Sequence, residues 1–275
     1  MTASNPRRLD VTVDGGWLSA EIAGAGPDLL LVHSGITDRR MWDDQMPALR
    51  RHFRVARYDL RGFGSSSDVS GPYSHVDDLR AVIAALGLER PVVVAASLGA
   101  RVALDLAVDD PGLFDRMVLV GPAISGARFE DPAFRAVWQE IIAAYDAGDV
   151  ERAIELETAF WVHGPTRPPG TEHRAAFERV MRMQRDIWSR APDDDPELEP
   201  DPPAVERLST LSMPILIIVG EHDLSDIHRN ANRIVSDAAD AREVVMPGLG
   251  HLPNLEGPDG FNRLILDFLS ANSTT

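Results

Sequence analysis

The sequence contains no cysteine. This absence excludes disulfide bonds, thiolate metal sites and a cysteine nucleophile from the chemistry that the chain can carry out. We expect neither a metal ion nor a cofactor.

Long apolar runs are also missing. No uninterrupted apolar segment approaches the roughly 18 residues that a helix needs to span a bilayer, and even the apolar region 91–108 contains Arg101 and Asp105. The first ten residues, MTASNPRRLD, lack the apolar centre of a signal peptide. We therefore expect a cytoplasmic protein without a membrane span.

Positive charge is scarce. The chain has 27 Lys and Arg residues against 43 Asp and Glu residues, which gives a formal net charge of −16. Such a chain should repel the phosphates of nucleic acids and anionic membrane surfaces. We expect the charge to aid solubility and the binding partner to be a small-molecule substrate, and the composition leaves the oligomeric state open.

Short apolar runs recur along the 275 residues, and they predict the strands of one large domain. Runs that are apolar throughout are typical of parallel strands covered on both faces, and they occupy residues 28–33, 53–59, 91–96, 116–121 and 214–220. Two alternating runs, 9–13 and 17–23, flank the turn DGG and predict an antiparallel hairpin. A last strand is expected over 241–248.

Helical patterns lie between these runs at residues 74–87, 98–112 and 259–270. Ser74 is a suitable first cap, and Gly87 a suitable stop, for the first of these helices. Alternating strands and helices predict an α/β fold with a mostly parallel, eight-stranded sheet and flanking helices.

One interval, residues 122–212, interrupts the alternation; we name it the cap segment. It contains no convincing strand, and it shows helical periodicity at 132–149, 150–162 and 173–188 before an acidic, proline-rich run at 193–203. We expect it to be a helical insertion into a core made of residues 1–121 and 213–275. The alternative is that the acidic run links two independent domains.

The stretch VVVAASLGAR, residues 92–101, ends an apolar run in a small-residue turn that contains Ser97. It resembles the nucleophile turn G-x-S-x-G, with Ala95 in place of the first glycine and Gly99 in place of the second. A serine between a strand and a helix lies at the carboxyl edge of a parallel sheet, where ligand sites form. Ser97 is therefore a candidate nucleophile, although serines are also common in ordinary turns.

A serine nucleophile needs a base. His251 lies in the glycine-rich loop PGLGHLPNLEGP between the last strand and the last helix, where its ring could reach a group on another strand. His33 ends a buried strand and is better explained as a structural residue, while His222 is a weaker candidate for the base. The alternative for His251 is a solvent-exposed loop histidine.

The base needs a carboxylate to orient it. Asp223 follows the strand at 214–220 and is the preferred acid over its neighbours Glu221 and Asp226, though it could instead cap a helix. No acid follows the preceding strand, in LVGPAIS at 119–125. The order Ser97, Asp223, His251, each just past a different strand, is the order of α/β-hydrolase triads.

An oxyanion hole needs two backbone N–H donors. Leu98, directly after the serine, is expected to supply one. The loop HSGITDRRMW after the strand at 28–33 should supply the other from Gly35, with Ile36 as the neighbouring alternative.

Over nearly its whole length the chain resembles the α/β-hydrolase fold superfamily. The resemblance rests on LLLVHSGITDRRMW, YDLRGFGSSS, VVVAASLGARVALDLA, RMVLVGPA, PILIIVGEHD and MPGLGHLPNLEGP, in this order. It implies that the cap segment is a lid, that a pocket lies beneath it near Ser97, and that the loop formed by Asp59, Arg61, Gly62 and Gly64 supports the site. Ala95 and Ser34 depart from the family's glycine pattern.

The cap segment is rich in aromatic side chains, some of which could line an apolar pocket although helical spacing also suits a core. The residues expected at the pocket are Ile36, Trp42, Trp138, Trp161 and Leu252. These features favour a serine hydrolase that cleaves a small or medium, apolar carboxylic ester or lactone through an acyl-enzyme. The alternatives are a non-hydrolytic enzyme of the same fold (a cofactor-free oxygenase, lyase or perhydrolase) and a ligand-binding protein with an idle triad.

Overall fold

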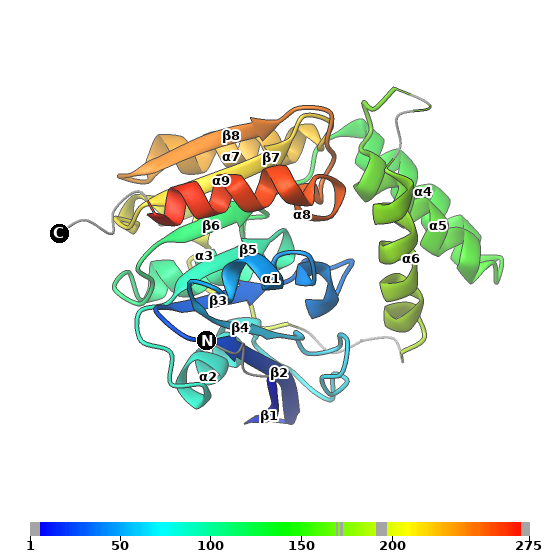
Figure 1. The fold of residues 1–275 in the computed structure, drawn as a ribbon. Coiled ribbons are helices and arrows are strands. Elements are labelled where there is room, and N and C mark those ends of the chain that lie inside the picture. The colour runs from blue at the N-terminus through cyan, green and yellow to red at the C-terminus, as the bar shows by residue number, and fades with distance from the viewer. Residues whose placement is uncertain (1–5, 169, 171–172, 191–196, 271–275) are drawn as a thin grey trace.

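The computed structural model describes residues 6–168, 170, 173–190 and 197–270. An eight-stranded sheet crosses the molecule in the order β1-β2-β4-β3-β5-β6-β7-β8 (Figure 1). Its strands are β1 (Arg7–Val13), β2 (Gly16–Gly24), β3 (Asp28–Val32), β4 (Arg54–Tyr58), β5 (Val92–Ala96), β6 (Met117–Val120), β7 (Ile215–Gly220) and β8 (Ala241–Met246). Each lies within two residues of a run that the sequence pattern predicts.

The sheet is mostly parallel. Two neighbouring pairs are antiparallel, β1 with β2 and β2 with β4, and the first closes the predicted hairpin by pairing Val13 with Gly16. The other neighbours pair in parallel. Every residue of β5 and β7 is buried, because helices cover both faces of a parallel sheet. The predicted fold class is confirmed.

Helices pack on both faces of the sheet (Figure 1). One face carries α2 (His75–Ala85), α3 (Leu98–Asp109) and α7 (Ser225–Asp237), and the other carries α1 (Met46–Leu49), α8 (Pro253–Glu256) and α9 (Pro258–Ser270). The sequence pattern identifies α2, α3 and α9 but misses α7, whose buried face has only Ile227, Ala231 and Ile234 as apolar residues. None of the helices described by the structure is long and apolar enough to cross a bilayer.

The cap segment is helical, as its periodicity predicts. It contains α4 (Pro132–Asp146), α5 (Val150–His163) and α6 (Arg174–Trp188), followed by the 3-10 turns η2 (Ala204–Glu206) and η3 (Leu208–Thr210). The three long helices lie together beyond one end of the sheet (Figure 1). Asp131 and Asp149 cap the first two of them through their carboxylates. Residues 193–196 of the predicted irregular run lie outside the described residues.

Candidate active site

Ser97 occupies the turn between β5 and α3. Its backbone angles, φ 51° and ψ −111°, lie in a region that residues other than glycine rarely adopt. The turn is held because the Ser97 N–H donates to the Val120 carbonyl at 2.9 Å and the Ser97 carbonyl accepts from the Arg101 N–H at 3.0 Å. Ser97 is consequently part-exposed at the end of a fully buried strand.

The two small residues around Ser97 meet different constraints. A Cβ atom on Gly99 would lie 2.5 Å from the His33 carbonyl oxygen and 2.8 Å from that of Val32, so only glycine fits there. Ala95 is completely buried and its methyl group is part of the apolar core, where a small side chain is accommodated. The first position of the turn therefore accepts alanine, whereas the second does not accept a Cβ.

Asp223 and His251 form a buried pair just past the ends of β7 and β8. His251 Nδ1 lies 2.8 Å from Oδ2 and 3.0 Å from Oδ1 of Asp223, and the side chains are 2% and 1% exposed. The carboxylate also accepts the Leu224 N–H at 2.7 Å, which fixes its orientation. A proton on Nδ1 that is directed at Asp223 leaves Nε2 of His251 as the nitrogen that can accept another proton.

Gly121, directly after β6, allows this pair to approach the sheet. A Cβ atom on Gly121 would lie 2.8 Å from Cε1 of His251 and 3.2 Å from Oδ2 of Asp223, and its φ is 51°. Because Val120 also accepts the Ser97 N–H, the imidazole lies against the strand that neighbours the serine. The sequence pattern does not predict this role of Gly121, and the one signal for it is a glycine directly after a core strand.

The two predicted oxyanion donors belong to segments that meet. A Cβ atom on Gly35 would lie 3.4 Å and 3.5 Å from the Cδ2 and Cβ atoms of Leu98, and both residues are part-exposed, whereas Ile36 is buried. Ser34 braces this loop, since its hydroxyl lies 2.9 Å from that of Thr37 and its carbonyl accepts the Thr37 N–H at 3.2 Å. The serine in place of the family's glycine thus has a structural role.

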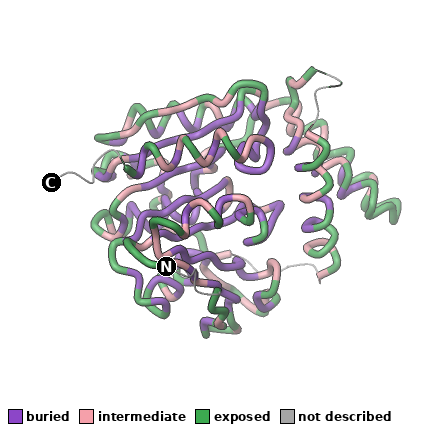
Figure 2. Tube along the Cα trace, in the orientation of Figure 1, coloured by how far each residue is buried: buried purple, intermediate pink, exposed green. Residues whose placement is uncertain are grey.

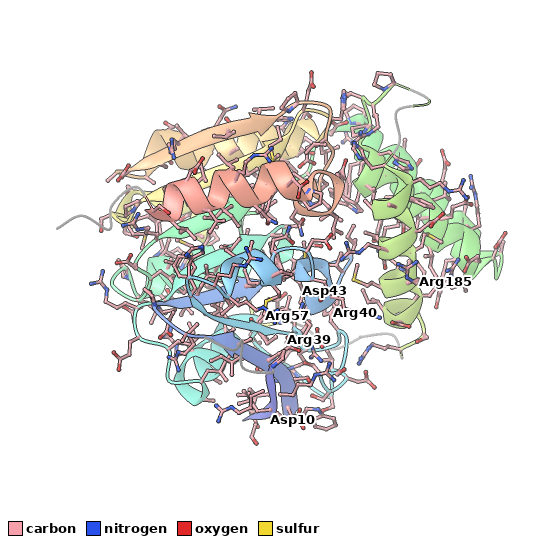
Figure 3. The ribbon with its side chains drawn as sticks, viewed as in Figure 1. Asp10, Arg39, Arg40, Asp43, Arg57 and Arg185 are labelled. Atoms are coloured by element: carbon pink, nitrogen blue, oxygen red, sulfur yellow. The ribbon has the colours of Figure 1, made fainter. Side chains whose placement is uncertain are left out.

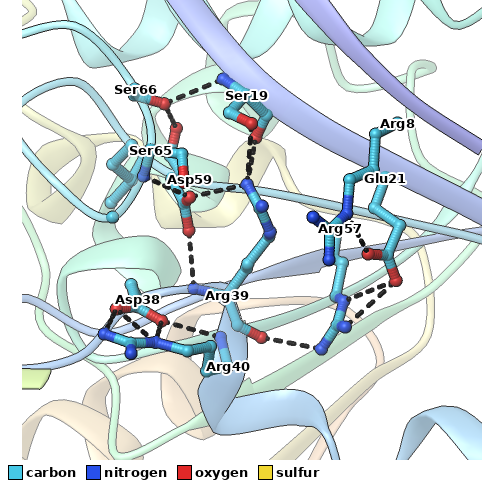
Figure 4. Close-up of polar contacts among 12 residues, drawn as sticks. Arg8, Ser19, Glu21, Asp38, Arg39, Arg40, Arg57, Asp59, Ser65 and Ser66 are labelled. Carbon is cyan, nitrogen blue, oxygen red and sulfur yellow. Dashed lines mark hydrogen bonds and ion pairs between the residues drawn. The ribbon is translucent and has the colours of Figure 1, made fainter. Parts of the chain in front are cut away.

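An ionic network joins the loop after β3, residues 33–42, to the end of β4 and the segment after it (Figure 4). Asp59 accepts the Arg39 N–H at 2.9 Å, the Arg39 guanidinium at 2.6 Å and the Ser65 N–H at 2.8 Å. A Cβ atom on Gly64 would lie 2.3 Å from the Asp59 carboxyl carbon. These contacts hold residues 59–66 against η1 (Arg39–Trp42).

His33 has a structural role, as the sequence pattern predicts. Its Nε2 accepts the Leu60 N–H at 2.9 Å, and its Nδ1 therefore donates to the Ser34 carbonyl at 2.8 Å. Complete burial lowers the pKa of the ring, so the histidine is neutral and links two loops.

A cavity of about 630 Å³ lies between the cap segment and the core and reaches Leu98, the residue after Ser97. Its walls are mainly apolar. The cap segment contributes Trp138, Ile141, Ile142, Tyr145, Ile187 and Trp188, and the core contributes Phe63, Val69 and Leu98. An apolar cavity of this size suits a small or medium organic molecule.

The charged side chains at the cavity are paired. Arg61 donates to Asp78 at 2.7 and 2.9 Å, and Arg101 donates to Glu197 at 2.6 Å. Burial, reinforced by the charge of Arg101, lowers the pKa of His75 to about 3, so this histidine is neutral. Among the residues that the structure describes, no group of three or more His, Asp or Glu side chains could hold a metal ion.

The five residues expected at the pocket separate into two groups. Trp138 lines the cavity, and the Trp161 ring packs 4.6 Å from the His251 ring. Trp42 and Leu252 are completely buried, and Ile36 is 7% exposed. These three residues do not line this cavity, and the Trp42 ring packs 6.3 Å from that of Phe261 on α9.

The model of the Alpha/beta hydrolase family matches residues 29–264. The chain belongs to the alpha/beta hydrolase family.

Several relatives of this alpha/beta hydrolase match nearly its whole length. A pyrrolizixenacetamide deacetylase from Xenorhabdus hominickii is 29% identical, with 94% of this chain and 97% of the relative covered. A pimeloyl-[acyl-carrier protein] methyl ester esterase from Nitrosomonas europaea is 26% identical, with 88% and 95% covered. The crystal structure of a hydrolase from Pseudomonas aeruginosa superposes with a TM-score of 0.74 at 31% identity, covering 97% of this chain and 98% of that one.

Proposed function

We propose that this alpha/beta hydrolase is a serine hydrolase that cleaves a small or medium, largely apolar carboxylic ester or lactone. The observation that carries the proposal is the buried Asp223–His251 pair at 2.8 Å, placed against the strand beside the strained turn of Ser97. The name of one relative, a methyl ester esterase, supports the choice of an ester bond.

In the proposed reaction, Nε2 of His251 takes the hydroxyl proton of Ser97 while Oγ attacks the substrate carbonyl carbon. Asp223 stabilises the imidazolium that forms. The N–H groups of Leu98 and Gly35 stabilise the oxyanion. His251 then gives the proton to the departing alkoxide, and a water molecule activated by the same ring hydrolyses the acyl-enzyme, which releases the acid and restores Ser97.

The cap segment has a separate part in this proposal. Residues 1–121 and 213–275 form the catalytic core, and residues 122–212 act as the lid that selects the substrate. The apolar wall formed by α4 and α6 supports an apolar group on one side of the scissile bond. The cytoplasmic location expected from the sequence remains a prediction.

A fluorophosphonate probe tests the nucleophile directly, and p-nitrophenyl esters of increasing acyl length test the substrate class. Wild type should be labelled and Ser97→Ala should not, with a loss of kcat/KM of about 10⁴-fold or more. An unlabelled wild type contradicts the proposal and favours an idle triad. Equal labelling of both proteins also contradicts the proposal, because the probe would then react with a residue other than Ser97. Full turnover of a substrate by Ser97→Ala favours a non-hydrolytic enzyme that uses His251 as its base.

A further inference from the structure

The carboxylate of Glu256, on α8, holds the backbone on both sides of His251. Its Oε2 accepts the Gly250 N–H at 2.8 Å, and its Oε1 accepts the Leu252 N–H at 3.2 Å. The two bonds hold the backbone amides of the residues on either side of the histidine. Glu256 therefore determines where the backbone of the proposed base lies.

Glu256 has a buried counter-ion that comes from the cap segment. Its side chain is completely buried, and it forms an ion pair with Arg167, whose side chain is 2% exposed; His173 Nε2 lies 4.0 Å away. The Arg167 guanidinium also donates to the carbonyl of His163 at the end of α5 and to that of Gly248, each at 2.6 Å. Arg167 thus joins the cap segment, the loop before His251 and Glu256.

A second link between the cap segment and His251 runs through Trp161 on α5. The His251 N–H donates to the Trp161 carbonyl at 3.2 Å, and the two rings lie 4.6 Å apart. A shift of α5 would therefore move both the backbone and the ring environment of the histidine.

We propose that Glu256 and Arg167 are positioning residues that make the working orientation of His251 depend on how the cap segment is seated on the core. This inference rests on the proposed function, in which His251 is the base. Neither residue contacts the reacting atoms; they act through the Gly250 and Leu252 amides. Removing one partner leaves a charge buried without compensation, and a displacement of a catalytic group by about 1 Å can reduce the rate about 100-fold.

The test uses two variants of the full chain, Glu256→Gln and Arg167→Lys. Glutamine cannot accept both amides, and lysine keeps the charge but loses the planar fork that reaches several carbonyls at once. Each variant should lower kcat for a p-nitrophenyl ester by about tenfold or more with KM changed by less than about threefold. The double variant should lose no more than either single variant, because the two residues act as one unit.

Asp186→Asn is the matched control, since it breaks another ion pair across the same interface. Asp186 on α6 pairs with Arg40 at 2.6 Å, and both side chains are about half exposed. This variant should keep kcat within about twofold of wild type. An equal loss in the control would overturn the inference, because any loosening of the cap segment would then have the same effect.

A proton NMR resonance from the His251 Nδ1–H bonded to Asp223 gives a readout that does not depend on turnover. It should shift or broaden in Glu256→Gln and Arg167→Lys and stay unchanged in Asp186→Asn. If the resonance or kcat is unchanged in both Glu256→Gln and Arg167→Lys, the positioning role is overturned. If Glu256→Gln fails to fold, the result for Arg167→Lys decides alone. Full turnover by Ser97→Ala would refute the proposed function while leaving the NMR result to decide the position of His251.

Discussion

The sheet and the cap segment differ in how much of their side-chain surface is buried (Figure 2). All residues of β5 and β7 are buried, whereas α4 buries only Ile141 among its 15 residues. Trp138, Ile142 and Tyr145 of α4 are 45–49% exposed. The packed sheet fixes the loops that carry the proposed triad, and the looser cap segment presents apolar surface to the cavity.

Ion pairs connect the cap segment to the core, whereas apolar packing holds the helices on the sheet. Besides apolar contacts, ion pairs join the cap segment to the core, among them Arg40–Asp186, Arg179–Asp44 and Arg190–Asp68. Arg40 points from η1 toward α6 (Figure 3). The chain contains no lysine, so guanidinium groups make these links, and they hold carboxylates and carbonyls together. The seating of the cap segment therefore depends more on charge than the packing of the sheet does.

Gly121→Ala changes the core and should have the largest effect among the variants that keep the proposed triad intact. The new methyl group would meet the His251 ring and the Asp223 carboxylate, in a backbone conformation that disfavours alanine. We expect kcat/KM to fall about 1000-fold with KM little changed. Steady-state kinetics on a p-nitrophenyl ester measure the loss.

Gly148→Ala is the control in the cap segment. Its φ is 78°, but nothing lies within 4 Å of an added Cβ. It should cost about 1 kcal/mol of stability and leave kcat/KM within about twofold. Comparable losses in the two variants would show that the close approach at Gly121 is not what matters.

Ala95→Val tests the crowding of the strand below Ser97. Two more methyl groups at a fully buried position should displace the turn, lowering kcat/KM by about 10- to 100-fold and stability by about 1–3 kcal/mol. Ala95→Gly should stay within about threefold of wild type, because a smaller residue leaves the strained turn in place. Normal turnover in Ala95→Val would refute the idea of a crowded turn.

Asp105→Asn tests the hydrogen bonds at the place where the cap segment meets the core. Asp105 on α3 accepts the Ser125 hydroxyl at 2.5 Å, and Ser125 Oγ accepts the Ala204 N–H at 2.8 Å, so the bond network touches both ends of the cap segment. Burial raises the pKa of Asp105 to about 6, from a usual value of 3.8. The neutral acid is favoured in the folded protein, so its stabilising contribution is complete below about pH 4 and is lost as the pH rises through about 6.

Wild type should therefore lose about 2–3 kcal/mol relative to Asp105→Asn between pH 4 and pH 7. Urea unfolding of both proteins across this range measures the difference. Parallel stability profiles for wild type and Asp105→Asn would rule out the burial effect.

Trp138→Ala changes only the cap side and should have the smallest effect. The indole lines the cavity and stacks on Phe134, with ring centroids 6.1 Å apart. We expect KM for a medium-chain ester to rise about tenfold, equivalent to about 1.4 kcal/mol, while the acetyl ester is little affected. Trp17→Ala, at a similarly exposed tryptophan on β2, should leave KM for both esters unchanged. An equal fall in kcat for both esters in Trp138→Ala would contradict the idea that this side chain contributes to substrate binding alone.

The strands could be predicted because fully buried runs such as 92–96 consist of apolar residues alone. Ser97, Asp223 and His251 could be predicted because each lies in a loop that follows one of these strands. α7 was missed because its buried stripe of three apolar residues is diluted by charged neighbours. The position of Trp42 in the loop 33–42 predicts a place at the pocket. Its ring instead packs against Phe261, which is more than 200 residues away in the sequence and which a local pattern therefore cannot indicate. Gly121 and Glu256 likewise contact residues that are distant in the sequence or lie in another loop, and hydrophobic periodicity does not indicate such contacts.

The sparse burial of α4 has a consequence for how the protein can change over evolution. A helix with one buried side chain in 15 can accept many substitutions without a large loss of folding free energy. Its exposed face nevertheless forms part of the wall of the cavity. Under the proposed function, single substitutions on α4 should therefore alter substrate preference while leaving the fold intact, and a library on this face is the way to redirect the enzyme.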